Sequence, residues 1–323
     1  MSESRGPELS VILVADSFEK IAPVIAAFAA QSVVESIEMV IVLPTDAAEN
    51  TDATRFAKFS SVKVVKLDHV LPMGPSRAVG IRAATAPVVF IGETHSFPLA
   101  GFAEAIIEAH KDPWEVIVPG IGNANPSGAR SWSSFLLDYG YWFSGLSAAQ
   151  VPSGPTWNAS YKREVLIGLG PLLDGAMSSG DALPMALKAR NSRYYFEPRA
   201  RMIHVNLERR GWADERYLSG LVVGANRGKR WSLSRRLVYF AASPLVPFVL
   251  IYRNSSALRH LHSQRLLPPG TGGAIVAGSI VRTFGEAIGY LVGLSPKAES
   301  RMEEYELNKV HYVSRVLRPD EAS

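Results

Sequence analysis

The apolar residues of the first 121 positions fall into runs of five to eight, separated by stretches with helical spacing. Runs of this length indicate buried strands, and between the first two Ile21, Val24, Ile25 and Phe28 lie on one helix face. The predicted strands are 9–15, 37–44, 62–67, 87–91 and 114–121, and the predicted helices are 17–31, 76–85 and 99–110. This alternation predicts an α/β fold with a mostly parallel sheet, which binds ligands beyond the carboxyl ends of its strands.

The second half of the chain changes character, because aromatic residues and longer apolar runs replace the regular alternation. The pattern predicts helices at 131–144 and 180–190, a loop at 148–155, a strand leading into a helix over 157–166, and strands at 193–198 and 200–205. Two apolar stretches follow, at 237–252 and 274–294. The second fits an amphipathic helix hairpin or, alternatively, a helix packed on the first domain. The predicted domains are 1–210 and 211–323.

Glu93 and His95 directly follow the predicted strand 87–91, in the stretch VVFIGETHSFP. Alternate residues of an extended backbone point the same way, so both side chains can face one ligand at the carboxyl edge of the sheet. A carboxylate and an imidazole can share a divalent cation such as Mn²⁺ or Mg²⁺. The alternative is structural, with Glu93 capping the next helix and His95 exposed.

Composition excludes several classes of site. Hydrophobic residues make up 47% and charged residues 20% of the 323-residue chain, a balance that favours a sizeable core over disorder. The absence of cysteine excludes disulfides, thiolate metal sites and cysteine nucleophiles. The polar N-terminal stretch MSESRGPELS contains no apolar segment of the kind found in secretory signals.

Positive charge is concentrated between Arg199 and Arg236, where ten Lys or Arg oppose three acids although the net charge of the chain is +4. The apolar stretch 237–252, which contains Pro244 and Pro247, follows directly. A basic collar beside a proline-broken apolar segment favours a membrane surface with anionic lipid. The alternatives are a solvated basic face and, less favoured, a nucleic-acid site, for which the segment lacks a recognisable motif.

Four stretches of the chain resemble, in order and spacing, the motifs of the family 2 glycosyltransferases, whose catalytic domain has the GT-A fold. They cover roughly residues 8–206 and read ELSVILVADSFEKIAPVIAAFAAQSVVESIEMVIV, GPSRAVGIRAATAPVVFIGETH, PTWNASYKREVLIGLGPL and SGDALPMALKARNSRYYFEPRARMIHV. The tail segments SPLVPFVLIYR and FGEAIGYLVG resemble membrane-facing extensions of bacterial members. The resemblance implies a GT-A-type sheet flanked by helices, with a helical, membrane-associated C-terminal extension.

The resemblance also implies roles for acidic and histidine side chains. Glu93 and His95 fall on the family's metal motif, so that Glu-x-His stands in for Asp-x-Asp, and His204 falls on a histidine that is sometimes a further metal ligand. Asp181 falls on the acid that deprotonates the acceptor hydroxyl. Taken from the residues alone, Asp181 could instead cap the following helix, and His204 could be a hydrogen-bonded core histidine.

For a nucleotide-diphospho-sugar donor, the resemblance implies contacts from Val14, Asp16, Asp46, Arg77 and Glu93. Arg77 would contact phosphate or base, and its alternative is a surface ion pair.

For the acceptor, the resemblance implies contacts from Trp157 and Asn158. Trp157 could stack on a sugar ring, and its alternative is core packing.

These observations predict a metal-dependent, inverting glycosyltransferase of hexosyltransferase type, acting in polysaccharide biosynthesis. Its donor would be a nucleotide-diphospho-sugar, in the first place a UDP-sugar, its acceptor a saccharide or lipid-linked molecule, and its cofactor Mn²⁺ or Mg²⁺. It would lie on the cytoplasmic face of the inner or plasma membrane, peripheral or monotopic. No nucleic acid is expected as partner, and a homo-oligomer is left open.

Two alternative functions remain. The family's VDDGS is LPTDA here, and its Glu-Asp pair is Gly180-Asp181, so the first alternative is a non-catalytic, membrane-associated binding or assembly subunit. The second is a nucleotide-sugar hydrolase, because the same donor site could activate water.

Overall fold

The computed structural model of the chain describes residues 6–178 and 180–321, so the first half of the polar N-terminal stretch lies outside the described residues. By their internal contacts these residues form two compact units. The first contains the chain up to Gly120, then Ser147–Ile203 and a short terminal piece, and the second contains Ile121–Leu146 and His204–Arg318. The division into domains 1–210 and 211–323 stays a prediction.

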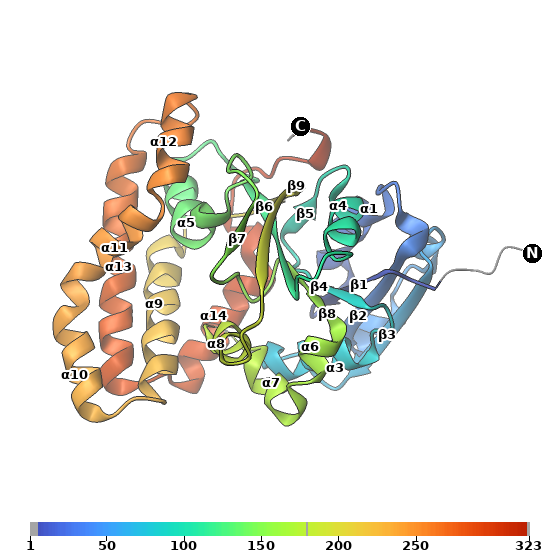
Figure 1. Ribbon diagram of the computed structural model, residues 1–323, viewed down its shortest axis with the longest axis horizontal. Coiled ribbons are helices and arrows are strands. Elements are labelled where there is room, and N and C mark those ends of the chain that lie inside the picture. The colour runs from blue at the N-terminus through green and yellow to red at the C-terminus, as the bar shows by residue number, and fades with distance from the viewer. Residues whose placement is uncertain (1–5, 179, 322–323) are drawn as a thin grey trace, which may run out of the picture. The chain divides into compact units, whose positions relative to one another are not determined.

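A mixed sheet has the strand order β3-β2-β1-β4-β8-β6-β9-β5, with β7 paired to β9 (Figure 1). Strands β3, β2, β1 and β4 run parallel to one another, whereas β8 runs antiparallel to both β4 and β6. The strands are β1 (Leu9–Val14), β2 (Ile37–Pro44), β3 (Ser61–Leu67), β4 (Val88–Ile91), β5 (Ser96–Pro98), β6 (Val116–Asn123), β7 (Ala149–Val151), β8 (Ala159–Lys162) and β9 (Tyr194–His204). The predicted α/β class, with a sheet flanked by helices, is confirmed; the sheet is mixed, because β8 and β7 pair antiparallel with their neighbours.

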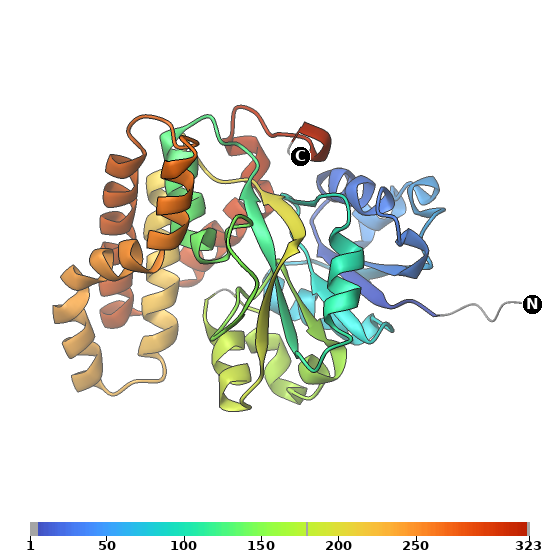
Figure 2. The same cartoon turned by 45° about the horizontal axis from the view of Figure 1, so that its top comes forward.

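Helices cover both faces of the parallel strands, as Figure 2 shows. Phe90 of β4 packs edge-on against Phe102 and near Phe28, so the helices that carry those two rings share one face. The neighbouring Ile12 of β1 pairs with Ile91 and therefore points to the opposite face, where it closely approaches Gly80. The helices of the first unit are α1 (Phe18–Ala29), α2 (Thr45–Glu49), α3 (Met73–Ala83), α4 (Phe102–Ala109), α6 (Arg163–Ile167), α7 (Leu173–Ala176) and α8 (Ala182–Ala189), with 3₁₀ turns η1 (Val34–Ser36), η2 (Ala53–Phe56), η4 (Gly170–Leu172) and η7 (Pro319–Glu321).

A buried carboxylate joins the strands near the edge opposite the predicted site. Glu38 of β2 accepts hydrogen bonds from Ser10 of β1 and from Thr85, just before β4, and it pairs with Lys63 of β3 at 2.9 Å. Burial alone would raise the pKa of Glu38, but these hydrogen bonds lower it to about 2. The carboxylate therefore stays charged and fixes the level at which β4 enters the sheet.

Three local predictions differ from the structure. The expected loop 148–155 contains β7, because Ala149–Val151 pairs with Tyr194–Phe196 of β9. The two strands expected at 193–198 and 200–205 are one strand, in which the pairing with β7 ends at Phe196, before Pro198. The stretch 274–294 forms one helix and not a hairpin of its own.

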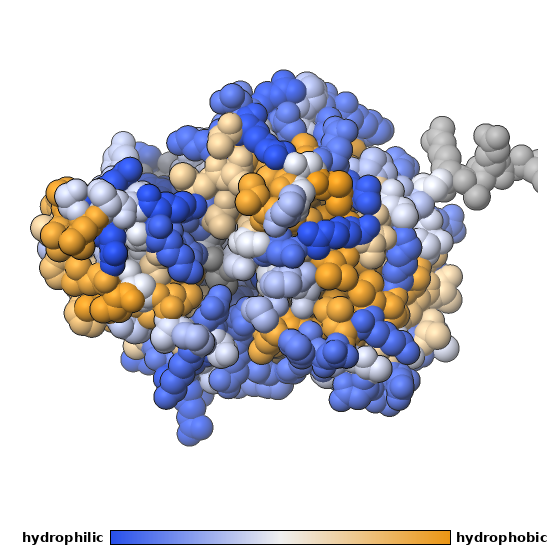
Figure 3. Space-filling model, turned by 90° about the horizontal axis from the view of Figure 1, so that it is seen from below, coloured by the Kyte–Doolittle hydropathy of each residue, from blue (hydrophilic) through white to orange (hydrophobic). Residues whose placement is uncertain are grey.

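The second unit is helical, apart from the strand ends it contributes (Figure 1). Its helices are α5 (Ala129–Tyr139), α9 (Trp212–Gly228), α10 (Leu233–Ala242), α11 (Val246–Arg253), α12 (Ser255–Ser263), α13 (Thr271–Val292) and α14 (Pro296–Asn308), with 3₁₀ turns η3 (Gly140–Trp142), η5 (Ser243–Leu245) and η6 (Lys309–Tyr312). The predicted helical C-terminal part is confirmed. Exposed apolar side chains gather on α10 and α11, whose surface is at the left of Figure 3.

Helices α9 and α13 touch backbone to backbone. A Cβ atom added to Gly220 of α9 would lie 1.8 Å from the carbonyl oxygen of Arg282, and one added to Gly285 of α13 would lie 2.0 Å from that of Tyr217. Gly224 and Gly289 are similarly close to the opposite backbone. Only glycine permits this approach, so the pair is held at a fixed separation.

We therefore predict that Gly220→Ala lowers the free energy of unfolding by about 1–3 kcal/mol, because the two helices must separate to admit a methyl group. Gly272→Ala is the matched control, since Gly272 of α13 has no neighbouring atom within 4 Å and alanine favours helix. Urea unfolding followed by circular dichroism compares the two. Equal stabilities would contradict the close packing.

Candidate functional site

Glu93 and His95 lie at the carboxyl edge of the parallel strands. The Gly92 N–H donates to the carbonyl of Ile12 at 3.0 Å, so the chain stays in register with β1 up to the residue before Glu93. Both side chains are buried, with 5% of Glu93 and 1% of His95 exposed. The structural alternative is wrong on both counts, because His95 is not exposed and the next helix, α4, has Gly101 at its N-cap.

The Glu93 carboxylate is held by neutral hydrogen-bond donors. Its Oε2 atom accepts a short hydrogen bond from Asn158 Nδ2 and another from Ser96 Oγ at 3.0 Å. The Nε2 atom of His95 lies 3.5 Å from the same oxygen, and its Nδ1 atom is 3.2 Å from Thr94 Oγ1. A buried carboxylate with such donors is positioned to face a cation.

Asn158 reaches Glu93 through an unusual backbone. Its φ is +56°, in the left-handed region that asparagine tolerates better than most residues. Its N–H donates to the carbonyl of Ile91, the last residue of β4, at 2.7 Å. Two residues earlier, Thr156 Oγ1 donates to the carbonyl of Gly180 at 3.3 Å. Residues 156–158, called the bridging segment below, therefore connect the end of β4 with the start of α8.

The side chain of Arg77 lies against Trp157 of the bridging segment. The Arg77 guanidinium is 3.9 Å from the centre of the Trp157 ring, and its Nη1 atom donates to the Met177 carbonyl at 3.4 Å. Arg77 is buried, so its alternative as a surface ion pair is wrong. Trp157 is half-buried, and one face of its indole is covered by the cation, which contributes about 0.5–2 kcal/mol.

His204 is the last residue of β9, which continues into it from Ile203 without a break. Its Nδ1 atom lies 2.9 Å from Asn206 Oδ1, and the Asn206 amide donates to Asn123 Oδ1. Asn206 Oδ1 is therefore the acceptor, His204 carries its proton on Nδ1, and the lone pair is on Nε2. Burial, and then the charge of Lys309, holds the pKa of His204 well below its usual value. The ring is neutral at neutral pH, the form that binds metals.

Glu93, His95 and His204 form a group whose ligand atoms all lie within 4.8 Å of one another, and all three are buried. Each has a hydrogen-bond partner that fixes it, in Asn158, Thr94 and Asn206 respectively. One carboxylate with two imidazoles is a donor set suited to Mn²⁺ and other first-row divalent ions. The residues present therefore fit a metal site, as the sequence predicts, while the metal's identity stays a prediction.

Asp181 occupies the N-cap position of α8, but its side chain makes no capping hydrogen bond. Asp181 therefore stands where a capping residue would, but it does not make the hydrogen bond by which a cap stabilises a helix. The side chain is half-buried, and the preceding Gly180 is bonded to the bridging segment. Asp181 is accordingly tied through one residue to the segment that also positions Glu93, and its role as base stays a prediction.

The other residues predicted to contact the nucleotide-sugar donor lie at the ends of β1 and β2 or directly after them. Val14 ends β1, and Asp16 follows it and pairs with Lys20 at 2.7 Å. Asp46 lies in α2, directly after β2, and is exposed. Because β1, β2 and β4 are parallel, all three residues lie at the same edge of the sheet as Glu93.

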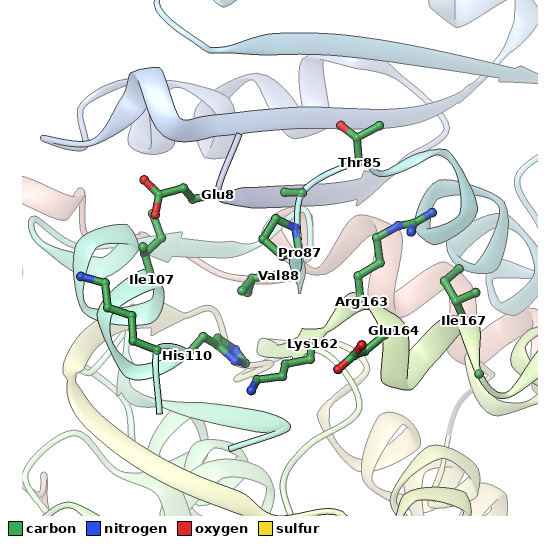
Figure 4. Close-up of a pocket in the computed structure, with 13 residues that line it drawn as sticks. Glu8, Thr85, Pro87, Val88, Ile107, His110, Lys162, Arg163, Glu164 and Ile167 are labelled. Atoms are coloured by element: carbon green, nitrogen blue, oxygen red, sulfur yellow. The ribbon is translucent and has the colours of Figure 1, made fainter. Parts of the chain in front are cut away.

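A pocket of about 780 Å³ lies at the opposite edge, where β4 begins and β8 ends (Figure 4). His110 points toward Lys162 there, and burial, and then the charge of Lys162, lowers the pKa of His110 to about 3. Ser160 is buried and lies 2.9 Å from His110, and Arg163 lines the pocket. Ser160 and Arg163, which belong to the quoted stretch PTWNASYKREVLIGLGPL, therefore lie away from Glu93, whereas Asn158 of the same stretch lies beside it.

Sequence reasoning missed the residues that hold the site in place. Ser96, Thr156 and Asn206 were not singled out, although each is a small polar residue next to a predicted site residue. Ser96 follows His95, Thr156 precedes Trp157 and Asn206 lies two residues after His204, and this proximity in the sequence was the available signal.

No protein-family model and no curated protein matches the chain. Among solved structures, it is similar to the mannosyltransferase PcManGT from Pyrobaculum calidifontis in complex with GDP-Man and Mn²⁺, with a TM-score of 0.51, 14% identity and 88% of each chain covered. It is also similar to S. aureus TarS 1–349, with a TM-score of 0.45, 16% identity, and 86% of this chain and 90% of that one covered. The first likeness shows a glycosyltransferase fold, and membership of family 2 stays a prediction.

We predict that the Asn158 amide controls metal affinity. Asn158→Gly keeps the left-handed backbone but removes the donor to Glu93, so affinity for Mn²⁺ should fall about 10–100-fold and stability by about 1–3 kcal/mol, the cost of a buried carboxylate that loses a donor. Asn158→Ala should lose the same affinity and, in addition, about 1 kcal/mol of stability from its backbone. Calorimetric Mn²⁺ titration and thermal unfolding measure the two effects. Unchanged affinity in Asn158→Gly would contradict this role.

Proposed function

We propose that the chain is a metal-dependent glycosyltransferase that uses a nucleotide-diphospho-sugar. The observation that carries this proposal is the buried group of Glu93, His95 and His204 at the carboxyl edge of a glycosyltransferase fold. The solved mannosyltransferase with this fold is described in complex with GDP-Man and Mn²⁺, which supports a donor and a metal of the same kind here.

The proposed metal is Mn²⁺ in preference to Mg²⁺. Mg²⁺ binds almost entirely through oxygen ligands, whereas two of the three side chains here offer imidazole nitrogen. A bound divalent ion would neutralise the negative charge of the leaving diphosphate. The role of the protein residues is to hold that ion, with Asn158 and Ser96 orienting the Glu93 carboxylate.

For the donor, Arg77 is a permanent cation buried beside the bridging segment, and it is proposed to contact phosphate or base. Val14, Asp16 and Asp46, at the same sheet edge, are proposed to contact the nucleoside. UDP- and GDP-sugars are both candidates, the first from the sequence resemblance and the second from the solved neighbour.

For the acceptor, we assign proton removal to Asp181, in an inverting transfer. The Asp181 carboxylate takes the proton of an acceptor hydroxyl while that oxygen forms a bond to the anomeric carbon and the bond to the diphosphate oxygen breaks. Its half-exposed position suits a group that meets an incoming substrate. Trp157 and Asn158 lie in the bridging segment, which Thr156 bonds to Gly180, the residue before Asp181. A saccharide or lipid-linked molecule is the proposed acceptor.

A first experiment tests the metal and donor. In calorimetry, the wild-type protein should bind UDP-sugars or GDP-sugars only when Mn²⁺ is present. Glu93→Gln or His95→Gln should weaken that binding at least about tenfold. His110→Gln is the matched control, a buried histidine at the opposite edge of the sheet, and should bind like wild type. Nucleotide binding that is indifferent to divalent ions, or absent with every one, would refute the proposal.

A second experiment tests catalysis. Asp181→Asn should retain Mn²⁺-dependent nucleotide binding and lose at least about a hundredfold in turnover, because it removes the general base. Released nucleotide diphosphate is measured with and without saccharide acceptors. Release that needs an acceptor supports transfer, release without one supports a hydrolase, and binding without turnover under every condition supports the non-catalytic subunit.

A further inference from the structure

The second unit exposes an apolar surface that its own helices leave uncovered. Helices α10, η5 and α11 form one continuous helical stretch, Leu233–Arg253, whose length and composition make it a candidate membrane span. Only 6% of the most apolar part of this stretch is buried. Phe248 and Tyr252 are 72% and 79% exposed. The other exposed apolar residues of this stretch and of α13 are Leu233, Leu237, Val238, Tyr239, Phe240, Leu245, Val249, Val276, Ile280, Phe284, Leu291 and Val292. We call this set the apolar face.

The charge around the apolar face has one sign. Between Lys229 and Val292 the sequence contains eight Lys or Arg and a single acid, Glu286. Glu286 is buried and pairs with Arg227 at 2.8 Å, so it does not offset the exposed cations. Arg235 and Arg253 are exposed at the two ends of the Leu233–Arg253 stretch. A partner for this surface must therefore present both apolar material and negative charge.

Two features favour a position on the bilayer surface over a spanning one. The uninterrupted apolar part of Leu233–Arg253 is residues 237–252, about 24 Å of helix, which is shorter than the roughly 30 Å hydrocarbon core. Helix α13 carries Arg282 near its middle, and Arg282 donates to the carbonyl of Leu137 of α5 at 2.9 Å. Its glycine contact with α9 further holds α13 within the folded unit.

We infer that the apolar face lies on the surface of a bilayer rich in anionic lipid, with Leu233–Arg253 parallel to the membrane plane. Its apolar side chains enter the acyl boundary, and the flanking arginines contact lipid phosphates. The exposed tyrosines Tyr239 and Tyr252 suit the headgroup level. This inference goes beyond the proposed function, because it involves no residue of the donor site and its test needs no nucleotide.

Flotation with vesicles tests the inference on the full chain. The protein should float with phosphatidylcholine vesicles that contain phosphatidylglycerol and bind pure phosphatidylcholine much more weakly. The double variant Phe248→Glu with Tyr252→Glu should lose at least about tenfold in binding. Leu172→Glu is the control, since Leu172 is 67% exposed in the first unit and should bind like wild type. Arg235→Gln and Arg253→Gln should each lose about fivefold on anionic vesicles only.

A competing occupant is a second copy of the chain. The membrane inference is overturned if the wild-type protein fails to float and sediments as a dimer, while the Phe248→Glu, Tyr252→Glu double variant sediments as a monomer. Equal binding of wild type and the double variant to vesicles also overturns it.

Orientation can be measured cleanly, because the chain has no cysteine of its own. Single cysteines in place of Val238, Leu245 or Phe248, each carrying a fluorophore, are quenched by lipids labelled at known depths. A stretch that lies in the interface predicts similar, shallow depths at all three sites. A label at Leu245 near the bilayer centre, with Val238 and Phe248 nearer the surface, would show a spanning helix and overturn the inference.

Discussion

The hydrogen bond from Asn158 to Glu93 is the interaction on which the candidate site depends. A carboxylate buried at the end of a core strand is costly unless donors satisfy it. Asn158 supplies such a donor only because its backbone adopts the left-handed region and bonds to the last residue of β4. The same short segment stacks Trp157 on Arg77 and bonds Thr156 to Gly180. This one local conformation therefore positions Glu93, Arg77 and the start of α8.

The side chains of the candidate metal site are held in place by hydrogen bonds and carry little negative charge. His204 is neutral, with its proton directed to Asn206, so that its Nε2 lone pair can act as a ligand without first losing a proton. Glu93 and His95 give the site less negative charge than two carboxylates would. A site of this kind should bind its ion less strongly by charge alone and rely more on ligand geometry and on the donor's diphosphate.

Local pattern predicted much of the fold, because the parallel strands and their helices are formed by contiguous apolar runs. Strand β2 begins and ends where the pattern places it, and the acid at position 93 lies at the predicted edge. Strand β7 was missed because its three residues lack an apolar pattern and pair with a distant strand. The burial of Arg77 could not be predicted, since it depends on Trp157, eighty positions away. The bridging role of Asn158 likewise requires a backbone conformation that the sequence pattern does not reveal.

We propose that Glu93, His95 and His204 together hold a metal ion that also contacts the donor diphosphate, and pulsed electron paramagnetic resonance of the Mn²⁺-loaded chain with a nucleotide diphosphate tests this arrangement. We expect nitrogen couplings from imidazole ligands, lost stepwise in His95→Gln and His204→Gln, together with phosphorus couplings from the nucleotide. A spectrum of Mn²⁺ surrounded by water alone, or one with phosphorus but no nitrogen coupling, would rule out the three-residue metal site.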